Sequence, residues 1–144
     1  MPYTYSDELS TSDEAFCAWG YDLSELCVSV CDALIELMVV NPEQIAAEER
    51  RELALSCDSV EELIRNLLEK LLFYKDAEGV VVRLQQPEFC GQVGNVWQLK
   101  GEAWGEAIDP SRHETGVDVK AVTYHNFRVE WFQDKWQACV VVDV

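Results

Sequence analysis

An apolar stripe between Val60 and Leu72 constrains the fold of this chain more than any other feature. Asp58-Ser59-Val60-Glu61-Glu62, at its start, is a helix-capping signal. Its apolar residues recur three or four positions apart, which is typical of one face of an α-helix: Val60, Leu63, Ile64, Leu67, Leu68, Leu71 and Leu72. We predict a helix that ends by Lys75 and packs this face into the core, the alternative being a groove for a partner.

A second helix is predicted from Leu23 to about Val39. Asp22-Leu23-Ser24-Glu25 reads as a capping box, and Asn41-Pro42 ends the pattern. The apolar face of this helix holds Leu23, Leu26, Cys27, Val30, Leu34, Leu37 and Met38. The chain therefore supplies two long amphipathic helices.

The remaining sequence is rich in strand patterns. The segment 97–107 alternates between a small apolar face and a mostly polar face. The apolar face holds Leu99, Gly101, Ala103, Gly105 and Ala107, and the polar face holds Gln98, Lys100, Glu102 and Glu106. Further strands are predicted at 2–7, within 45–56, at 80–84, within 117–132 and at 136–144, with Gln133-Asp134-Lys135 as a tight turn into the last strand. We expect an α+β fold, a two-layer sandwich of a mainly antiparallel sheet with both helices on one face, in one domain spanning 1–144.

Length and composition exclude several classes. A chain of 144 residues is the size of one domain, and 49% hydrophobic residues argue against disorder. The apolar runs are short and interrupted by charge, so we expect no membrane-spanning helix. The start, Met-Pro-Tyr-Thr-Tyr, does not read as a signal peptide, which predicts a cytoplasmic protein.

Six cysteines are scattered through the chain without a Cys-x-x-Cys motif. In a cytoplasmic protein we expect all of them to be reduced thiols. Cys27 and Cys31 lie one helical turn apart and could contact one metal. With no His or further Cys nearby to complete a tetrahedral site, we predict buried core thiols.

The charge balance is strongly acidic. Twenty-seven acidic against eleven basic residues give a net charge of −16. This charge opposes direct binding to a nucleic-acid backbone, because affinity there comes mainly from Lys and Arg. It favours divalent cations and basic protein partners, although solubility alone is an alternative explanation.

The loop 109–116 is marked by Pro110 and Gly116 and carries Arg112-His113, a pair that could hold an anion. A solvated hairpin loop is the alternative. We predict that His113 is the freer of the two histidines. We expect His125 to be a core histidine on the apolar face of its strand, with Lys120 exposed on the other side.

The end of the chain raises an electrostatic question. Asp143 follows the apolar run Val140-Val141-Val142 and precedes the terminal carboxylate of Val144. Negative charges gathered at a sheet end repel one another, and a bound cation removes that cost. Carboxylate and carbonyl oxygens bind hard cations such as Ca²⁺ or Mg²⁺.

Several segments together resemble the signature of the archease family. The most specific is Val119-Lys120-Ala121-Val122-Thr123-Tyr124-His125, supported by Gly101-Glu102, Ile108-Asp109, Arg112-His113 and the closing strand 136–144. Near the start the chain keeps Thr11, Asp13 and Phe16 of the family pattern but has Leu9 where Asp is usual and Ser10 where His is usual.

The resemblance implies an accessory protein without catalysis of its own. Archeases are cofactors of the RtcB-type RNA ligase in tRNA splicing and RNA repair, where they promote guanylylation of the ligase histidine and multiple turnover. It also implies a metal site at Asp13, Asp143 and Val144, typically with Ca²⁺, while Mg²⁺ or Mn²⁺ would also suit the ligands.

Four further residues are expected to contact or activate the partner: Lys120, Arg112, His113 and Asp109. Two alternatives remain open. One is a metal-dependent phosphoester hydrolase using Asp13, Asp143, His113 and Arg112, although the chain has no Walker-type, Gly-x-Gly-x-x-Gly or Gly-x-Ser-x-Gly motif. The other is a general chaperone or adaptor.

Overall fold

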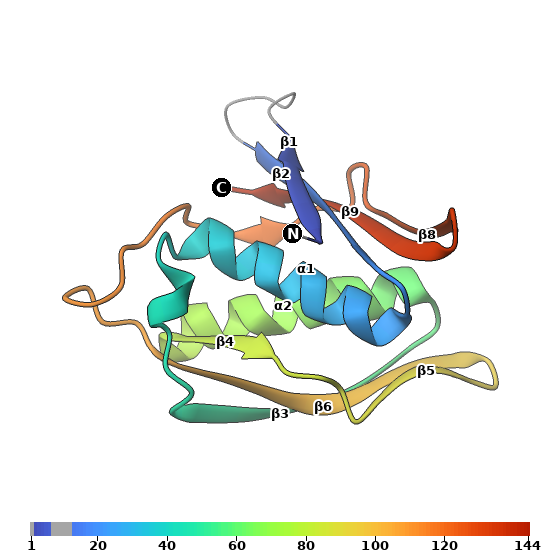
Figure 1. Ribbon diagram of the computed structural model, residues 1–144, viewed down its shortest axis with the longest axis horizontal. Coiled ribbons are helices and arrows are strands. Elements are labelled where there is room, and N and C mark those ends of the chain that lie inside the picture. The colour runs from blue at the N-terminus through green and yellow to red at the C-terminus, as the bar shows by residue number, and fades with distance from the viewer. Residues whose placement is uncertain (1, 7–12) are drawn as a thin grey trace.

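The computed structural model describes residues 2–6 and 13–144 of the chain. In those residues the chain forms nine strands, two α-helices and one short 3-10 helix (Figure 1). In chain order they are β1 (Tyr3–Ser6), β2 (Asp13–Gly20), α1 (Leu23–Met38), the 3-10 helix (Pro42–Gln44), β3 (Glu49–Cys57), α2 (Val60–Glu78), β4 (Val80–Leu84), β5 (Phe89–Val93), β6 (Val96–Ala107), β7 (Ala121–Val122), β8 (Arg128–Phe132) and β9 (Lys135–Asp143).

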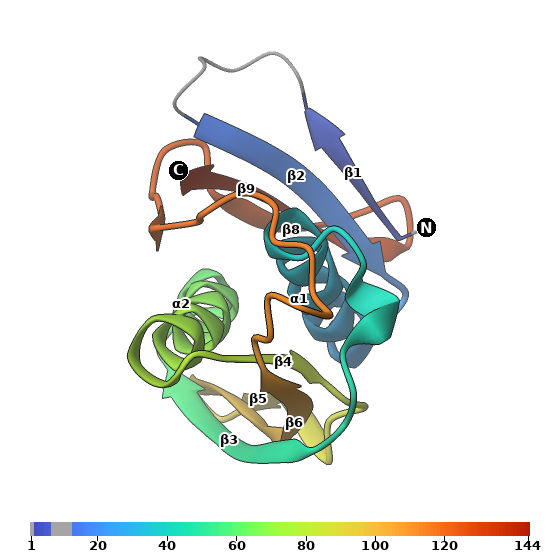
Figure 2. The same cartoon turned by 90° about the vertical axis from the view of Figure 1, so that its left-hand side faces the viewer.

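The strands form two antiparallel sheets. The first sheet has the order β1-β2-β9-β7, with β8 also paired to β9, and the second has the order β3-β6-β4, with β5 also paired to β6. Both helices lie between the sheets and contact strands of each (Figure 2). The predicted α+β class with antiparallel strands and two long helices is confirmed. The structure adds a second sheet, so the helices form the middle of three layers.

Helix α1 begins and ends where its sequence signals predict. The Asp22 carboxylate accepts a hydrogen bond from the Glu25 backbone N–H at 2.8 Å, and the Glu25 carboxylate accepts one from the Tyr21 N–H at 2.6 Å. These contacts satisfy N–H groups that the first helical turn leaves free. At the other end Val39 is extended, so the helix stops at Met38.

Helix α2 runs three residues past the predicted end at Lys75. It stops at Glu78 because Gly79 adopts a left-handed conformation, with φ of 67°, which glycine accepts readily. The predicted stripe is confirmed as a core face, since Leu63, Leu67 and Leu71 are all buried. Neither α-helix in the described ranges is long and apolar enough to span a membrane.

Strand β6 is central in the second sheet and pairs with β3, β4 and β5. Its predicted small face is buried from Leu99 to Gly105, while Ala107 at the strand end is exposed. A Cβ atom on Gly105 would overlap the backbone of Val81 on β4. Small residues here let the neighbouring chain approach the β6 backbone closely.

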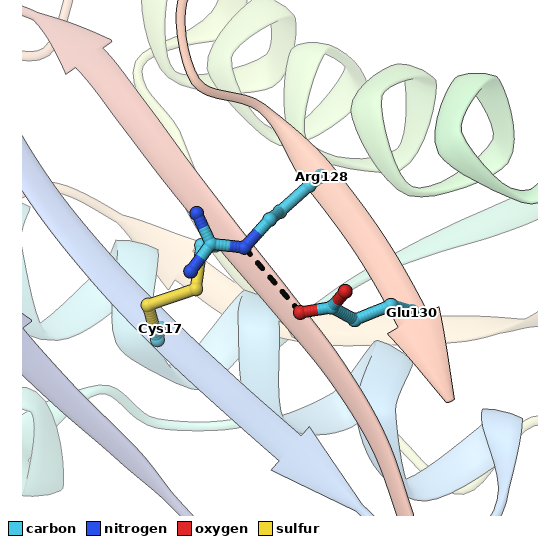
Figure 3. The surroundings of a disulfide bond; sticks show 4 residues. Cys17, Arg128 and Glu130 are labelled. Carbon is cyan, nitrogen blue, oxygen red and sulfur yellow. Dashed lines mark ion pairs between the residues drawn. A yellow bond between two sulfur atoms is a disulfide. The ribbon is translucent and has the colours of Figure 1, made fainter. Parts of the chain in front are cut away.

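The prediction of six reduced cysteines is wrong for one pair in this structure. Cys17 on β2 and Cys139 on β9 lie directly opposite in the strand register, with Cα atoms 4.1 Å apart, and form a disulfide (Figure 3). The two residues are 122 positions apart, so sequence spacing gives no sign of the pairing. The predicted burial of Cys27 and Cys31 as free thiols is confirmed.

The segment 117–132 contains less strand than its composition predicts. Only Ala121–Val122 and Arg128–Phe132 are strands, and between them the chain turns at Asn126, which has φ of 53°. The turn ends the two-residue alternation, so the prediction that His125 is a core histidine is wrong: its side chain is exposed. The predicted turn before the last strand is present, with Gln133 and Asp134 both at positive φ.

Candidate functional site

Two of the predicted metal ligands face each other across the first sheet. Asp13 is the first residue of β2, Asp143 is the last of β9, and the strand register pairs them directly. Directly opposed residues of an antiparallel pair point to the same side of the sheet. Because Phe16 and Val142 are buried toward the helices, the alternation of the strands places both carboxylates on the outer face, away from the helices.

The donor set at this sheet end suits a hard cation. Opposed carboxylates repel each other, and oxygen atoms of this kind prefer Ca²⁺ or Mg²⁺. Among residues 2–6 and 13–144, no group of three or more His, Cys, Asp or Glu side chains could hold a metal. Further ligands would therefore be main-chain oxygens, and those of Val144 follow Asp143 directly. The residues present fit such an ion, with two carboxylates as its charged ligands.

The departures from the family pattern at Leu9 and Ser10, like the retained Thr11, lie outside the described residues. Within the described residues, Lys120 lies beside Asp143, one of the two candidate metal ligands. Its backbone N–H donates to the Asp143 carbonyl at 2.8 Å, and its side chain is exposed, as predicted. Three residues far apart in the sequence, Asp13, Lys120 and Asp143, thus meet at one end of the first sheet.

The Cys17–Cys139 disulfide lies on the same outer face, four residues along each strand from the Asp13–Asp143 pair. Arg128 of β8 is opposite Cys139 in the register and pairs with Glu130, with 3.4 Å between Nε and Oε1 (Figure 3). The strands that carry the two aspartates are therefore held together covalently as well as by the ladder.

Arg112 and His113 bind an anion, but the anion is the carboxylate of Glu106 in the same chain. The Arg112 guanidinium donates to both oxygens of Glu106 at 2.9 Å, and His113 Nε2 lies 2.8 Å from Oε1. The Ala46 backbone N–H donates to the same carboxylate. These contacts, with the Arg112 hydrogen bonds as the main cause, lower the pKa of Glu106 to about 2.

The prediction that His113 is the freer histidine is wrong, because its ring is buried. The Asp109 backbone N–H donates to His113 Nδ1 at 2.9 Å. Nδ1 must therefore carry a lone pair, so Nε2 carries the hydrogen and donates it to Glu106. The neutral imidazole in this tautomer satisfies both neighbours.

Asp109 completes the folded loop. Its carboxylate accepts from the backbone N–H and the hydroxyl of Ser111 at 3.0 and 2.7 Å, and these bonds lower its pKa. The loop is also tied to the end of α1, where Gly116 N–H donates to the Met38 carbonyl. Asp109, Arg112 and His113 thus form a network at the end of β6, in which Lys120 takes no part.

The sequence pattern did not single out Glu106, which we predicted on the polar face of its strand. It is buried by the loop that folds back over it. The available signal was an acidic residue at the strand end followed, six and seven positions later, by Arg112 and His113.

Comparison with known proteins places this chain in a family. The model of the archease protein family (MTH1598/TM1083) matches residues 3–144. Protein archease of Pyrococcus abyssi is 34% identical over 135 residues, with 93% of this chain and 94% of the relative covered. Protein archease of Methanopyrus kandleri is 33% identical over 135 residues, with the same coverage.

Solved structures agree. The solution structure of Methanobacterium thermoautotrophicum protein 1598 superposes with a TM-score of 0.84 at 27% identity, covering 99% of each chain. The crystal structure of a Thermotoga maritima archease, described as a possible chaperone, gives a TM-score of 0.60 at 20% identity, covering 94% of this chain and 93% of the other, which supports the fold alone. The molecule is an α+β protein with opposed carboxylates at one sheet end. It belongs to the archease family.

Proposed function

We propose that this chain is a metal-binding protein cofactor of an RtcB-type RNA ligase. In this proposal it promotes guanylylation of the ligase histidine and multiple turnover during tRNA splicing or RNA repair, and has no catalytic activity of its own. Membership of the archease family supports the proposal. The partnership implies a cytoplasmic location with the ligase.

The observation that carries the metal part is the direct pairing of Asp13 with Asp143. Two carboxylates forced together by a strand register carry a repulsive cost that a divalent cation converts into an attraction. Asp13, Asp143 and the main-chain oxygens of Val144 would hold the ion. A bound Ca²⁺, or Mg²⁺ or Mn²⁺ in its place, would supply positive charge and fix the sheet end in one conformation.

Charge supports a basic protein as the partner. An RNA ligase needs a basic surface for its substrate, and a chain with net charge −16 is attracted to such a surface and repelled by free RNA. Lys120 lies beside Asp143 and is exposed, so it is the residue best placed to contact the ligase or its nucleotide.

The residues of the 109–116 loop are proposed to act in two ways, depending on whether their side chains are exposed. The Arg112 side chain is 44% exposed and can reach a partner while bound to Glu106. His113 and Asp109 would act through the loop they fold, because the imidazole is buried and the carboxylate is bonded to Ser111.

A ligation assay tests the proposal. A ligase alone is expected to stall after about one turnover, and substoichiometric amounts of this protein should restore repeated joining and faster guanylylation. Asp13→Asn and Asp143→Asn should remove both Ca²⁺ binding, measured by calorimetry, and stimulation. Calcium binding that survives in both folded variants would remove these residues from the metal site.

Two controls separate the alternatives. A general chaperone, the role suggested by the description of the Thermotoga relative, would suppress aggregation of unrelated unfolded clients, whereas a ligase cofactor would act only with the ligase. A metal-dependent hydrolase would turn over a phosphoester alone with Mn²⁺ or Mg²⁺. The structure ties Arg112 and His113 to Glu106, which disfavours their joining Asp13 and Asp143 in hydrolysis.

A further inference from the structure

Two free cysteines lie in contact outside the site described above. Cys27 is on α1 and fully buried, and Cys90 is on β5 and partly exposed. Their Sγ atoms are 3.5 Å apart, although the residues are 63 positions apart in the sequence. The contact joins the helix layer to the second sheet.

We propose that Cys27 and Cys90 form a redox-modification site, which a small-molecule disulfide such as oxidised glutathione converts into an intramolecular disulfide. The site would add a second covalent link to the molecule. It is separate from the Cys17–Cys139 bond, which lies within the first sheet.

The surroundings of Cys90 allow the pair to close. A disulfide needs the two sulfurs about 1.5 Å nearer than they are. In the described residues β5 pairs with β6 alone, and it enters β6 through a turn at Gly94, which has φ of 62°. An edge strand of five residues can shift toward α1 without breaking a second ladder.

Cys90 is the thiol that reacts first. It is the more accessible of the two, and its hydrogen bond from Cys27 lowers its pKa. The same hydrogen bond and burial raise the pKa of Cys27. The pair therefore combines an accessible attacking sulfur with a buried resolving sulfur.

The exchange proceeds in two balanced steps. The Cys90 thiolate attacks one sulfur of oxidised glutathione, which breaks the glutathione S–S bond, forms a mixed disulfide on Cys90 and releases one glutathione thiolate. The Cys27 thiol then loses its proton and attacks the Cys90 sulfur, releasing the second glutathione. Two cysteine thiols are oxidised, one glutathione disulfide is reduced to two thiols, and the two cysteine protons end on those thiols.

The other free thiols differ from this pair. Cys31, one turn from Cys27, is fully buried, and burial raises its pKa well above the ordinary range. Cys57 is partly exposed, like Cys90, and its sulfur accepts a hydrogen bond from the Asn66 side-chain amide at 3.2 Å. Cys57 is therefore the matched control.

The test equilibrates the wild-type protein in buffers of increasing oxidised-to-reduced glutathione ratio, alkylates free thiols and maps them by mass spectrometry. We expect the four free thiols to fall to two, with Cys27 and Cys90 recovered as one cross-linked peptide. The melting temperature should rise by about 4–10 °C, because the new bond constrains the unfolded chain. Backbone hydrogen exchange in β5 should slow.

Variants sharpen the result. Cys57→Ser should still lose two thiols and gain thermal stability, whereas Cys90→Ser should form no internal bridge and show no rise in melting temperature. The proposal is overturned if wild-type protein keeps all four thiols at every ratio, if the bridge maps to another pair, or if Cys90 remains as a stable mixed disulfide. The cysteine pairing mapped in the wild-type protein tests the proposal even if a variant fails to fold.

Discussion

Glu106, Arg112 and His113 fix the shape of the 109–116 loop at the level of single atoms. One carboxylate accepts hydrogen bonds from a guanidinium, an imidazole and a backbone N–H. Because the imidazole is buried, changing any one partner leaves another without its hydrogen bond. A sequence motif that looks suited to a foreign anion is instead satisfied from within the chain.

The low pKa of Glu106 predicts an acid-dependent loss of stability. Its value of about 2 in the folded protein lies below its ordinary 4.5. The unfolded chain therefore binds the proton first, and the stabilisation is present above about pH 4.5 and lost as the pH falls toward 2. Thermal melts should show wild type well above Glu106→Gln at pH 7, with the gap narrowing between pH 4.5 and 2. A gap independent of pH in that range would contradict this role for the charge.

The proposed metal site at Asp13 and Asp143 predicts opposite effects of one substitution on stability with and without metal. In chelator-treated buffer, Asp13→Asn should leave stability unchanged or raise it by up to about 1 kcal/mol, because it removes a like-charge contact. With Ca²⁺ at about 100 times its dissociation constant, the wild type should gain about 2.7 kcal/mol and the variant little. Denaturant melts in the two buffers measure both changes. Equal responses of variant and wild type to Ca²⁺ would exclude Asp13 as a ligand.

At the scale of elements, the helices are specified locally and the sheets by long-range pairing. The cap at Asp22, the cap at Ser59 and the stop at Gly79 act within a few residues of each helix end. The strands of the first sheet come from both ends of the chain, since β9 lies between β2 and β7. Helix boundaries were therefore predictable to within about three residues, while strand order was not.

The apolar face of α2 predicts a large cost of truncation. Leu67 is fully buried between the sheets, so Leu67→Ala should lower the free energy of unfolding by about 2–5 kcal/mol. Phe73, on the same helix and 51% exposed, provides the control, and Phe73→Ala should cost clearly less. Urea denaturation of the three proteins measures both. Similar losses in the two variants would mean that burial does not set the cost.

At the scale of the whole molecule, the net charge of −16 affects the rate at which the protein associates with charged partners. Long-range attraction raises the rate of association with a basic partner and is weakened by salt. The few basic side chains, Lys120 among them, can then confer specificity within an acidic surface.

The proposed docking of this acidic protein to an RNA ligase predicts that its stimulation of ligation falls as salt rises from low to physiological ionic strength. Lys120→Ala should reduce stimulation while leaving folding and Ca²⁺ binding intact, because a lysine desolvated in a complex is costly to remove. Lys100 is exposed on the second sheet, so Lys100→Ala is the matched control and should behave as wild type. If stimulation is unchanged both by added salt and by Lys120→Ala, docking is not electrostatic.

The sequence by itself determined what depends on neighbours along the chain. It predicted both helices, their caps, the small face of β6, the turn at Gln133-Asp134 and, through the Val119–His125 run, the family. These features depend on the helix period, the alternation of strands and the backbone preferences of a few residues, all of which act over a few positions.

Only the tertiary structure decided which distant residues meet. The opposition of Asp13 and Asp143, the Cys17–Cys139 disulfide and the contact of Cys27 with Cys90 all follow from sheet register and layer packing. The exchange of roles between the two histidines has the same origin. A turn at Asn126 exposes His125, because the two-residue alternation of a strand holds only while the strand continues. A loop that folds onto Glu106 buries His113, because burial depends on which distant parts of the chain pack over a residue.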